Sequence, residues 1–454
     1  MCAIRAKIKS DFISAYVSFP TKISLPKVVI IMYIKRTVEQ TIRNITSSFP
    51  VLLIIGPRQI GKTTLLQSLA EEGRKYVTLD DPGVRDLAVR EPALFLQRYS
   101  PPVIIDEIQY APQLLPFIKI YVDAVKTNGS FWLTGTHMFT ESKDAHESLA
   151  GRVGIIYLSG LSSSEISGNS LPEFSTSPKL LMQRISKAVP IDMMTIFERI
   201  HKGSMPAVYE RENVDWENFY SSYIQTYIRR DIKGLIKVND DMMFYRFLCI
   251  AASRTGTMVN YDLLAKETEI SAPTAKQWVS LLVSTGIVAL IEPYYNSALK
   301  RVVKSPRMYF LDTGLAAYLS KWSDAKALEA GAMAGAFFET WVVSEIYKSF
   351  LNVGKTPPLS YYRDSNSKEI DLIISQLNVV YPIEIKKSSH PEGVVSVFDV
   401  LSPITLDAND ESNRFAVDGY EHYGTLIGTG AVICLCNDLL PIDRKNWLVP
   451  AWLI

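Results

Sequence analysis

The sequence has few residues of the kinds that mark several protein classes. Its 454 residues include only four cysteines, which are too few and too scattered for a disulfide framework. This favours a reducing, cytoplasmic environment. No apolar run approaches the roughly 20 residues of a membrane-spanning helix, so no membrane partner is expected. The net charge is only +1, so any nucleic-acid-binding surface must be a local one.

A glycine-bounded loop is the most informative stretch. It follows an apolar run, Val51–Ile55, and opens into a helical pattern that begins at Thr64. A strand, such a loop and a helix form the context of a phosphate-binding loop, because glycines let backbone N–H groups point at phosphate oxygens. Lys62 would reach the β- and γ-phosphates and Thr63 would ligate Mg²⁺. The predicted ATP-binding residues are Gly56, Pro57, Arg58, Gln59, Ile60, Gly61, Lys62, Thr63 and Thr64.

Two adjacent carboxylates end a second apolar run, Val103–Ile105. Asp106 is predicted to bind Mg²⁺, and Glu107 is predicted to polarise the attacking water. A glutamate directly after the aspartate favours ATP hydrolysis over nucleotide storage. Another acidic pair, Asp80–Asp81, follows a short strand pattern. Helix capping is the favoured interpretation of this pair, and a place beside the nucleotide is the alternative.

These motifs resemble those of the AAA-type P-loop ATPases of archaea and bacteria that carry a C-terminal domain of uncharacterised function. The resemblance rests on residues 56–63, 79–82, 105–109, 133–135 and 149–152, and it continues through the chain after Met32. It implies an α/β fold with a parallel P-loop NTPase sheet, with ATP and Mg²⁺ as cofactors. Sites of this type are often completed by a neighbour's arginine, which is compatible with a homo-oligomer.

The same resemblance suggests further residues for the ATPase site. A strand pattern at 130–136 ends in hydroxyls, and a polar residue at this point senses the γ-phosphate in AAA-type proteins. Thr134 and Thr136 are the candidates, with ordinary strand-end capping as the alternative. Arg152 is a candidate arginine finger or sensor, and it could equally be a surface arginine.

The middle of the chain has the element order of a winged helix. Three helical patterns between residues 244 and 283 precede a strand pattern at 287–291 and a hairpin with four cations at 300–307. One interpretation is duplex DNA binding, in which a helix enters a groove and cations neutralise phosphates. The alternative is protein–protein contact or subunit packing. The candidate DNA-binding residues are Thr274, Lys276, Gln277, Lys300, Arg301 and Lys304.

The C-terminal third contains a helix acid, Glu339, a strand aspartate, Asp371, and the strand motif Glu384-x-Lys386. This constellation resembles the restriction-endonuclease-like superfamily. Asp371 and Glu384 would hold Mg²⁺, with Glu339 as a further ligand or partner, and Lys386 would position a metal-bound water. The alternative is a fold that binds or braces the ATPase domain and cuts nothing.

The sequence thus predicts an N-terminal extension (1–31), an AAA-type P-loop ATPase domain (32–165), a linker and helical segment (166–235), a winged-helix domain (236–325) and a restriction-endonuclease-like domain (326–454). Residues 1–31 are either a loosely ordered extension or the product of an upstream start codon. The favoured function is a DNA-associated ATPase that controls a nuclease-like domain. The alternatives are an ATP-dependent switch or scaffold that binds protein, and a metal-dependent nuclease with structural ATP.

Overall fold

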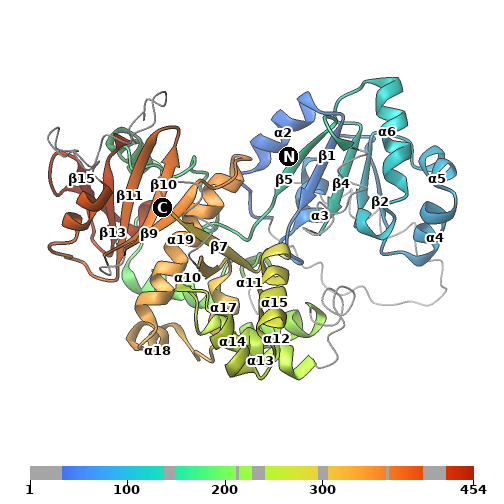
Figure 1. The fold of residues 1–454 in the computed structure, drawn as a ribbon. Coiled ribbons are helices and arrows are strands. Elements are labelled where there is room, and N and C mark those ends of the chain that lie inside the picture. Colours follow the sequence, from blue (N-terminus) through green and yellow to red (C-terminus); the bar gives the residue numbers. More distant parts are fainter. Residues whose placement is uncertain are drawn as a thin grey trace, which may run out of the picture. The chain divides into compact units, whose positions relative to one another are not determined.

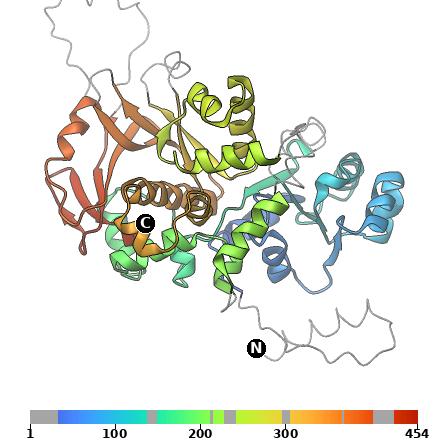
Figure 2. The same ribbon diagram turned by 90° about the horizontal axis from the view of Figure 1, so that it is seen from below.

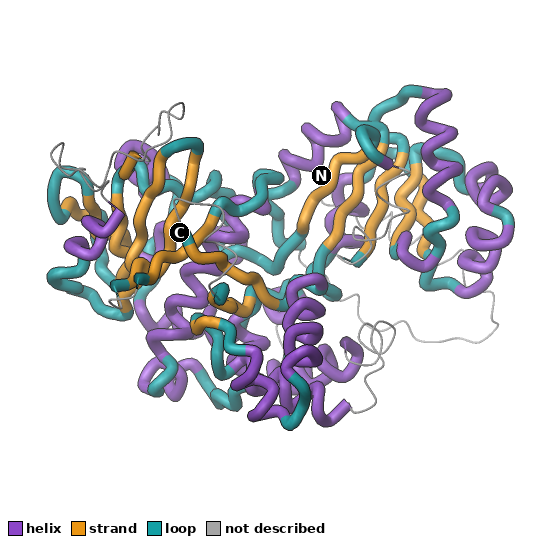
Figure 3. Tube along the Cα trace, viewed as in Figure 1, coloured by secondary structure: helices purple, strands orange, loops and turns teal. Residues whose placement is uncertain are grey.

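The computed structural model describes residues 33–136, 149–210, 214–227, 241–294, 305–364, 368–401 and 426–454. The chain divides into two units, Met1–Tyr33 and Ile34–Ile454, and every element below belongs to the second unit. Its strands form two separate sheets (Figure 3). None of the described helices is long and apolar enough to cross a membrane.

The first sheet has five parallel strands in the order β2-β3-β4-β1-β5. Its central strands β3, β4 and β1 are buried along their whole length, as expected for a parallel sheet covered on both faces. The strands are β1 (Val51–Ile55), β2 (Lys75–Thr78), β3 (Val103–Asp106), β4 (Phe131–Gly135) and β5 (Val153–Tyr157).

Helices flank this sheet (Figure 1). The side chains of α4, α5 and α6 join those of the strands in one apolar core, and α2 packs against β1 and β5. Asp81 accepts hydrogen bonds from Gly83 N (2.8 Å) and Val84 N (3.1 Å), which confirms that it caps α4. The helices are α2 (Glu39–Ser48), α3 (Lys62–Leu69), α4 (Pro82–Arg90), α5 (Pro92–Arg98) and α6 (Leu114–Val125).

A helical region follows, beginning just after β5. Asn260 and Ser271 cap α14 and α15 through their side chains, at the positions that the sequence predicts. The helices of this region are α8 (Ser163–Ile166), α9 (Pro178–Ile185), α10 (Met193–Lys202), α11 (Ala207–Glu210), α12 (Trp216–Tyr227), α13 (Asp241–Ala252), α14 (Tyr261–Thr268), α15 (Ala272–Ser284), α17 (Thr313–Leu319) and α18 (Ala325–Ala330).

The second sheet continues across the boundary expected at residue 325. Its order is β14-β15-β13-β11-β10-β9-β7-β8-β6, with β12 paired to β11, and β7 pairs in parallel with β9. The strands are β6 (Thr257–Met258), β7 (Val288–Pro293), β8 (Arg307–Phe310), β9 (Leu359–Arg363), β10 (Glu369–Gln376), β11 (Val379–Lys386), β12 (Leu426–Ile427), β13 (Gly430–Cys434), β14 (Leu440–Pro441) and β15 (Asn446–Pro450).

The long helix α19 (Ala334–Asn352) packs against β8 and β11 of this sheet (Figure 2). It is apolar on most of its circumference, and it also buries the charged pair Glu345 and Lys348. The Glu345 carboxylate accepts from Ser163 N at 2.7 Å, and the Lys348 amine donates to Leu161 O at 3.2 Å. These bonds tie α19 to the segment that follows β5.

Candidate functional site

The phosphate loop runs from the end of β1 to the start of α3. Gly61 precedes α3 with φ +85°, a left-handed conformation that glycine adopts without steric cost. A Cβ at Gly56 would lie 2.1 Å from the carbonyl oxygen of Leu158, so this close approach also requires glycine. The Lys62 amine donates to the carbonyl oxygens of Gly56 (3.0 Å) and Pro57 (2.8 Å). The loop therefore curls around the amine of its own lysine.

Asp106, at the end of β3, accepts hydrogen bonds from three hydroxyl groups. Thr63 donates to Oδ1 at 2.9 Å and Tyr76 donates to Oδ2 at 3.1 Å. Thr134 also donates to Oδ1. Burial and the Asp106 charge raise the pKa of Tyr76, so the Tyr76 hydroxyl remains a donor. Thr63 and Asp106 face each other from different elements and fit Mg²⁺, which takes a few protein oxygens and completes its shell with phosphates and waters.

Glu107 follows in a left-handed conformation, φ +60°, that is uncommon for a residue with a side chain. Its N–H donates to the Thr134 hydroxyl at 3.0 Å, and its carboxylate accepts from the Gln109 amide. Of the two sensor candidates, Thr134 therefore contacts the carboxylate of Asp106 and the backbone of Glu107. Strain of about 1–3 kcal/mol in such conformations is concentrated at functional sites.

Arg152 lies at the amino-terminal end of β1, opposite the end that leads into the phosphate loop. Its carbonyl oxygen accepts from Val51 N at 3.2 Å, at the start of β1, whereas the phosphate loop follows the other end of that strand. Its guanidinium pairs with Asp123 at 2.5 Å on the surface. The structure does not bring Arg152 to the phosphate loop of its own chain.

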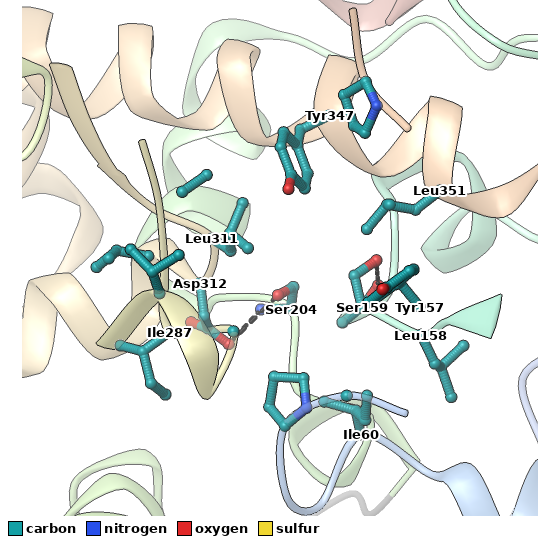
Figure 4. A pocket seen from close by; sticks show the side chains of 18 of the residues that line it. Ile60, Tyr157, Leu158, Ser159, Ser204, Ile287, Leu311, Asp312, Tyr347 and Leu351 are labelled. Carbon is teal, nitrogen blue, oxygen red and sulfur yellow. Dashed lines mark hydrogen bonds between the residues drawn. The ribbon is translucent and has the colours of Figure 1, made fainter. Parts of the chain in front are cut away.

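A cavity of about 480 Å³ adjoins the phosphate loop (Figure 4). Ser204 and Asp312 contribute polar groups to its wall, and the Ser204 hydroxyl donates to Asp312 at 3.3 Å. A largely apolar cavity with a few polar groups, within the roughly 300–1,000 Å³ of small-molecule sites, is typical of a binding pocket. Its apolar wall residues include Ile60, Leu158, Ile287, Leu311, Tyr347 and Leu351.

In the C-terminal region, the structure brings together the four residues singled out in the sequence. The Lys386 amine lies 3.2 Å from Asp371 Oδ2 and 2.6 Å from Glu384 Oε2. Asp371 Oδ2 also accepts from Ile385 N at 2.9 Å. The Tyr309 hydroxyl donates to Glu339 Oε1 at 2.7 Å. We call the four acids gathered here the carboxylate cluster: Glu339, Glu369, Asp371 and Glu384.

Arg307 enters this cluster from β8. Its guanidinium lies 2.7 Å from Glu369, 3.3 Å from Glu339 and 3.7 Å from Asp371, and its side chain is only 7% exposed. The sequence pattern places Arg307 with three other cations in a basic hairpin at 300–307, but the structure buries its side chain among acids. The sequence missed the contact because its partners lie more than 30 residues away on other elements, and a single arginine at a strand start gives no signal of them.

Burial alters the protonation of two acids in the cluster. Burial and the Asp371 charge raise the pKa of Glu339 to about 7 and that of Glu384 to about 8. Arg307 opposes the shift of Glu339 and Lys386 opposes that of Glu384. The two groups therefore hold protons to a higher pH than exposed glutamates do.

The cluster does not fit a divalent ion in this arrangement. Mg²⁺ would take one or two of these carboxylates, with oxygens directed at one point and not held by cations of the chain. Instead, oxygens of Asp371 and Glu384 bond to Lys386, and Glu339 bonds to Arg307 and Tyr309. Across the described ranges, no group of three or more His, Cys, Asp or Glu side chains is arranged to hold a metal ion.

The candidate DNA-binding residues are described only in part. Lys276 and Gln277 are exposed on α15, and Thr274 is half-buried with Oγ1 2.7 Å from the Ser271 hydroxyl. The remaining three, Lys300, Arg301 and Lys304, lie outside the described residues.

Comparison with known families agrees with the geometry of the first sheet. Residues 48–167 match the family described as AAA domain. Residues 193–326 match Domain of unknown function (DUF8612), and residues 334–454 match Domain of unknown function (DUF4143). The chain thus carries a P-loop ATPase domain of the AAA type and a C-terminal domain of unknown function, as the motifs predict.

Relatives of the chain include two uncharacterized proteins, Rv2008c of Mycobacterium tuberculosis and Mb2031c of Mycobacterium bovis. Each is 27% identical over 372 residues, which cover 82% of this chain and 78% of the relative. Among solved structures, the Walker-type ATPase PABY2304 of Pyrococcus abyssi is 14% identical, with 65% of this chain and 99% of that chain covered and a TM-score of 0.39. AMPPCP-bound DnaA of Aquifex aeolicus is 12% identical, with coverages of 54% and 85% and a TM-score of 0.27.

Proposed function

We propose that this chain binds ATP with Mg²⁺ and hydrolyses it. The observation that carries the proposal is the meeting of Thr63 and Asp106 at 2.9 Å beside the lysine-centred loop. Thr134 extends this contact to the backbone of Glu107. A hydroxyl at the start of the helix that follows β1, and a metal-binding acid and a following glutamate at the carboxyl end of β3, are the parts that phosphoryl transfer to water requires.

Each residue has a distinct role in this proposal. The Lys62 amine exchanges loop carbonyl oxygens for the β- and γ-phosphate oxygens. Thr63 and Asp106 hold Mg²⁺, which when bound neutralises phosphate charge. Glu107 accepts a proton from the attacking water and so orients it. The nucleoside lies in the adjoining cavity, where apolar walls exclude water from the base.

ATP turnover by Glu107→Gln tests the proposal. The amide keeps the shape of the side chain and cannot act as a base, so turnover should fall by roughly 10²–10⁴-fold with ATP binding retained. Lys62→Ala should lose ATP binding, and Glu72→Gln, at an exposed acid, is the matched control. Normal turnover by Glu107→Gln would remove Glu107 from the mechanism.

A second candidate function is binding of duplex DNA by the middle region. The observation that favours it is the element order α13, β6, α14, α15, β7, β8, in which β6 and β7 both pair with β8 in antiparallel fashion. This is the order of a winged helix, and it leaves Lys276 and Gln277 exposed on α15.

Salt-dependent retention on duplex DNA tests this function. Replacing Lys300, Arg301 and Lys304 together by Ala should weaken binding and reduce the salt slope by about 1 for each phosphate that the variant no longer neutralises. Lys276→Ala should weaken binding as well. Retention that ignores salt and these changes would favour the alternative, an ATP-dependent switch or scaffold whose C-terminal half binds a protein.

A further inference from the structure

The carboxylate cluster is bound by a cation of the chain itself. Arg307 meets acids from two elements, Glu339 on α19 and Glu369 and Asp371 on β10. Its guanidinium carbon also lies 4.9 Å from the ring centroid of Tyr361 on β9, a cation–π contact. One guanidinium therefore joins α19, β9 and β10 to the strand β8 that carries it.

Because they are buried, the Arg307 guanidinium and the acids each need the opposite charge of the other. A guanidinium removed from water is costly unless acids and hydrogen bonds compensate it, and the same holds for the acids. Arg307 contacts Glu339 and Asp371, two of the acids that the sequence predicts as metal ligands. Two cations within a few ångströms repel strongly in a buried site. Occupation of the cluster by Arg307 therefore opposes binding of a divalent ion.

The position of Arg307 in the sheet adds a second consequence. Arg307 on β8 lies opposite Ile291 on β7. Residues 287–290, at the start of the same β7 strand, line the cavity beside the phosphate loop. Of these two paired strands, β7 lines the cavity and β8 contributes Arg307 to the carboxylate cluster.

We propose that Arg307 is an internal counter-ion that fastens the β7–β8 pair to the C-terminal region and closes the carboxylate cluster to divalent cations. In this role the cluster connects α19, β10 and β8, and Lys386 pairs with Glu384, which Arg307 does not contact, and shares Asp371 with Arg307. The inference stands on the ion pairs and does not depend on ATP hydrolysis.

Charge rescue in the full chain tests the fastening. Arg307→Met should lower the thermal unfolding midpoint, because three acids each lose one cationic partner. Glu369→Gln added to Arg307→Met should recover part of that loss, because one of the three acids is then neutral. Arg307→Lys should fall between wild type and Arg307→Met, since lysine keeps the charge and loses the fork of donors.

The matched control is Arg363→Met. Arg363 also pairs with Glu369, at 3.1 Å, but its side chain is 39% exposed, so a small shift is expected. Equal losses in Arg307→Met and Arg363→Met, or no recovery on adding Glu369→Gln, would overturn the proposal.

A second experiment tests whether the carboxylate cluster excludes divalent cations, and it does not require Arg307→Met to fold. It compares Mn²⁺ binding to the wild-type chain and to Asp371→Asn, both without nucleotide. Titration calorimetry should give the same number of Mn²⁺ ions and the same affinity for both proteins. Any Mn²⁺ ion that binds wild type and does not bind Asp371→Asn would show that the cluster is open, and would overturn the proposal.

Discussion

At the scale of single residues, Thr134 carries an unusual share of the candidate ATPase site. It is fully buried, and its hydroxyl both donates to Asp106 and accepts from Glu107 N. In the proposed ATPase mechanism, Asp106 has to hold a set position for metal binding and Glu107 for water activation. A threonine at a strand end, which the sequence alone leaves open to capping, thus positions two acids at once.

Thr134→Val removes this hydroxyl with little change in shape. We expect the chain to lose about 1–3 kcal/mol of unfolding free energy, because buried partners lose a hydrogen bond. ATP turnover should fall more than ATP binding, since Glu107 loses its backbone anchor. Steady-state kinetics and nucleotide titration measure the two effects. Thr136→Val is the control, and an equal loss of turnover in both variants would contradict the special position of Thr134.

His201 at the end of α10 gives a prediction for pH dependence. Its ring stacks on Trp216 with centroids 4.2 Å apart, and its Nε2 lies 3.1 Å from Trp322 O. Burial lowers the pKa of His201 below its usual value, although the Trp322 carbonyl and Asp324 oppose the shift. Below about pH 6.5 the unfolded chain therefore binds a proton that the folded chain resists, and stability present above this pH is lost as the pH falls.

Denaturant unfolding at several pH values between about 7 and 5 measures this effect. His201→Gln keeps a hydrogen-bond donor and has no group that titrates in this range. We expect the variant to lose less stability on acidification than wild type does. An equal or steeper loss in His201→Gln would show that other groups determine the acid sensitivity.

At the scale of elements, the end of α15 meets the phosphate loop. Gly286 follows α15 with φ +72°, and a Cβ there would lie 3.0 Å from Pro57 Cγ and 3.1 Å from Pro57 Cδ. The exposed face of the same helix carries Lys276 and Gln277. The residue that follows α15 therefore contacts the phosphate loop, and the exposed face of α15 is a candidate for DNA contact.

Gly286→Ala tests this contact against a matched control. Gly151 has almost the same φ, +73°, but nothing lies within 4 Å of a Cβ built on it. Both alanine variants should lose roughly 1–2 kcal/mol of stability from left-handed strain. Only Gly286→Ala should also weaken ATP binding, because its methyl group pushes against Pro57. Equal ATP affinity in the two variants, measured by titration, would exclude this coupling.

Many of the helices and strands of the chain could be predicted from the sequence. Apolar runs predicted β1, β3 and β4, and side-chain caps at Asn260 and Ser271 predicted the starts of α14 and α15. Contacts between helices and strands that lie far apart in the sequence could not be predicted from it. Nothing in the local pattern of β7 shows that it pairs with β9, because register between strands that are far apart depends on packing. For the same reason the sequence missed Tyr76 beside Asp106 and Arg307 in the carboxylate cluster.

At the scale of the whole molecule, the cavity beside the phosphate loop is lined by segments that lie far apart in the sequence. Its wall includes the loop, the residues after β5, the start of β7 and the end of α19. A ligand that fills it would contact all of them together. Binding to the folded state alone adds about 2.7 kcal/mol of stability at a hundredfold excess over Kd.

Hydrogen exchange with and without ATP and Mg²⁺ tests how far this stabilisation extends. We expect slower exchange in the phosphate loop, in Val288–Pro293 of β7 and in the last turns of α19. The strand β2, at the far edge of the first sheet, should change little. Protection confined to the phosphate loop would show that the nucleoside does not occupy the cavity.

The pairing of β7 with β9 also limits how this chain can be rearranged in evolution. Glu292 and Pro293 on β7 lie beside Ser360 and Tyr361 on β9, so one ladder spans two regions that match different families. A break between them would leave two open strand edges, and such edges recruit foreign strands and promote aggregation. Gene fusions that exchange only one of the two regions should therefore be selected against, and residues 257–454 should be inherited as one block.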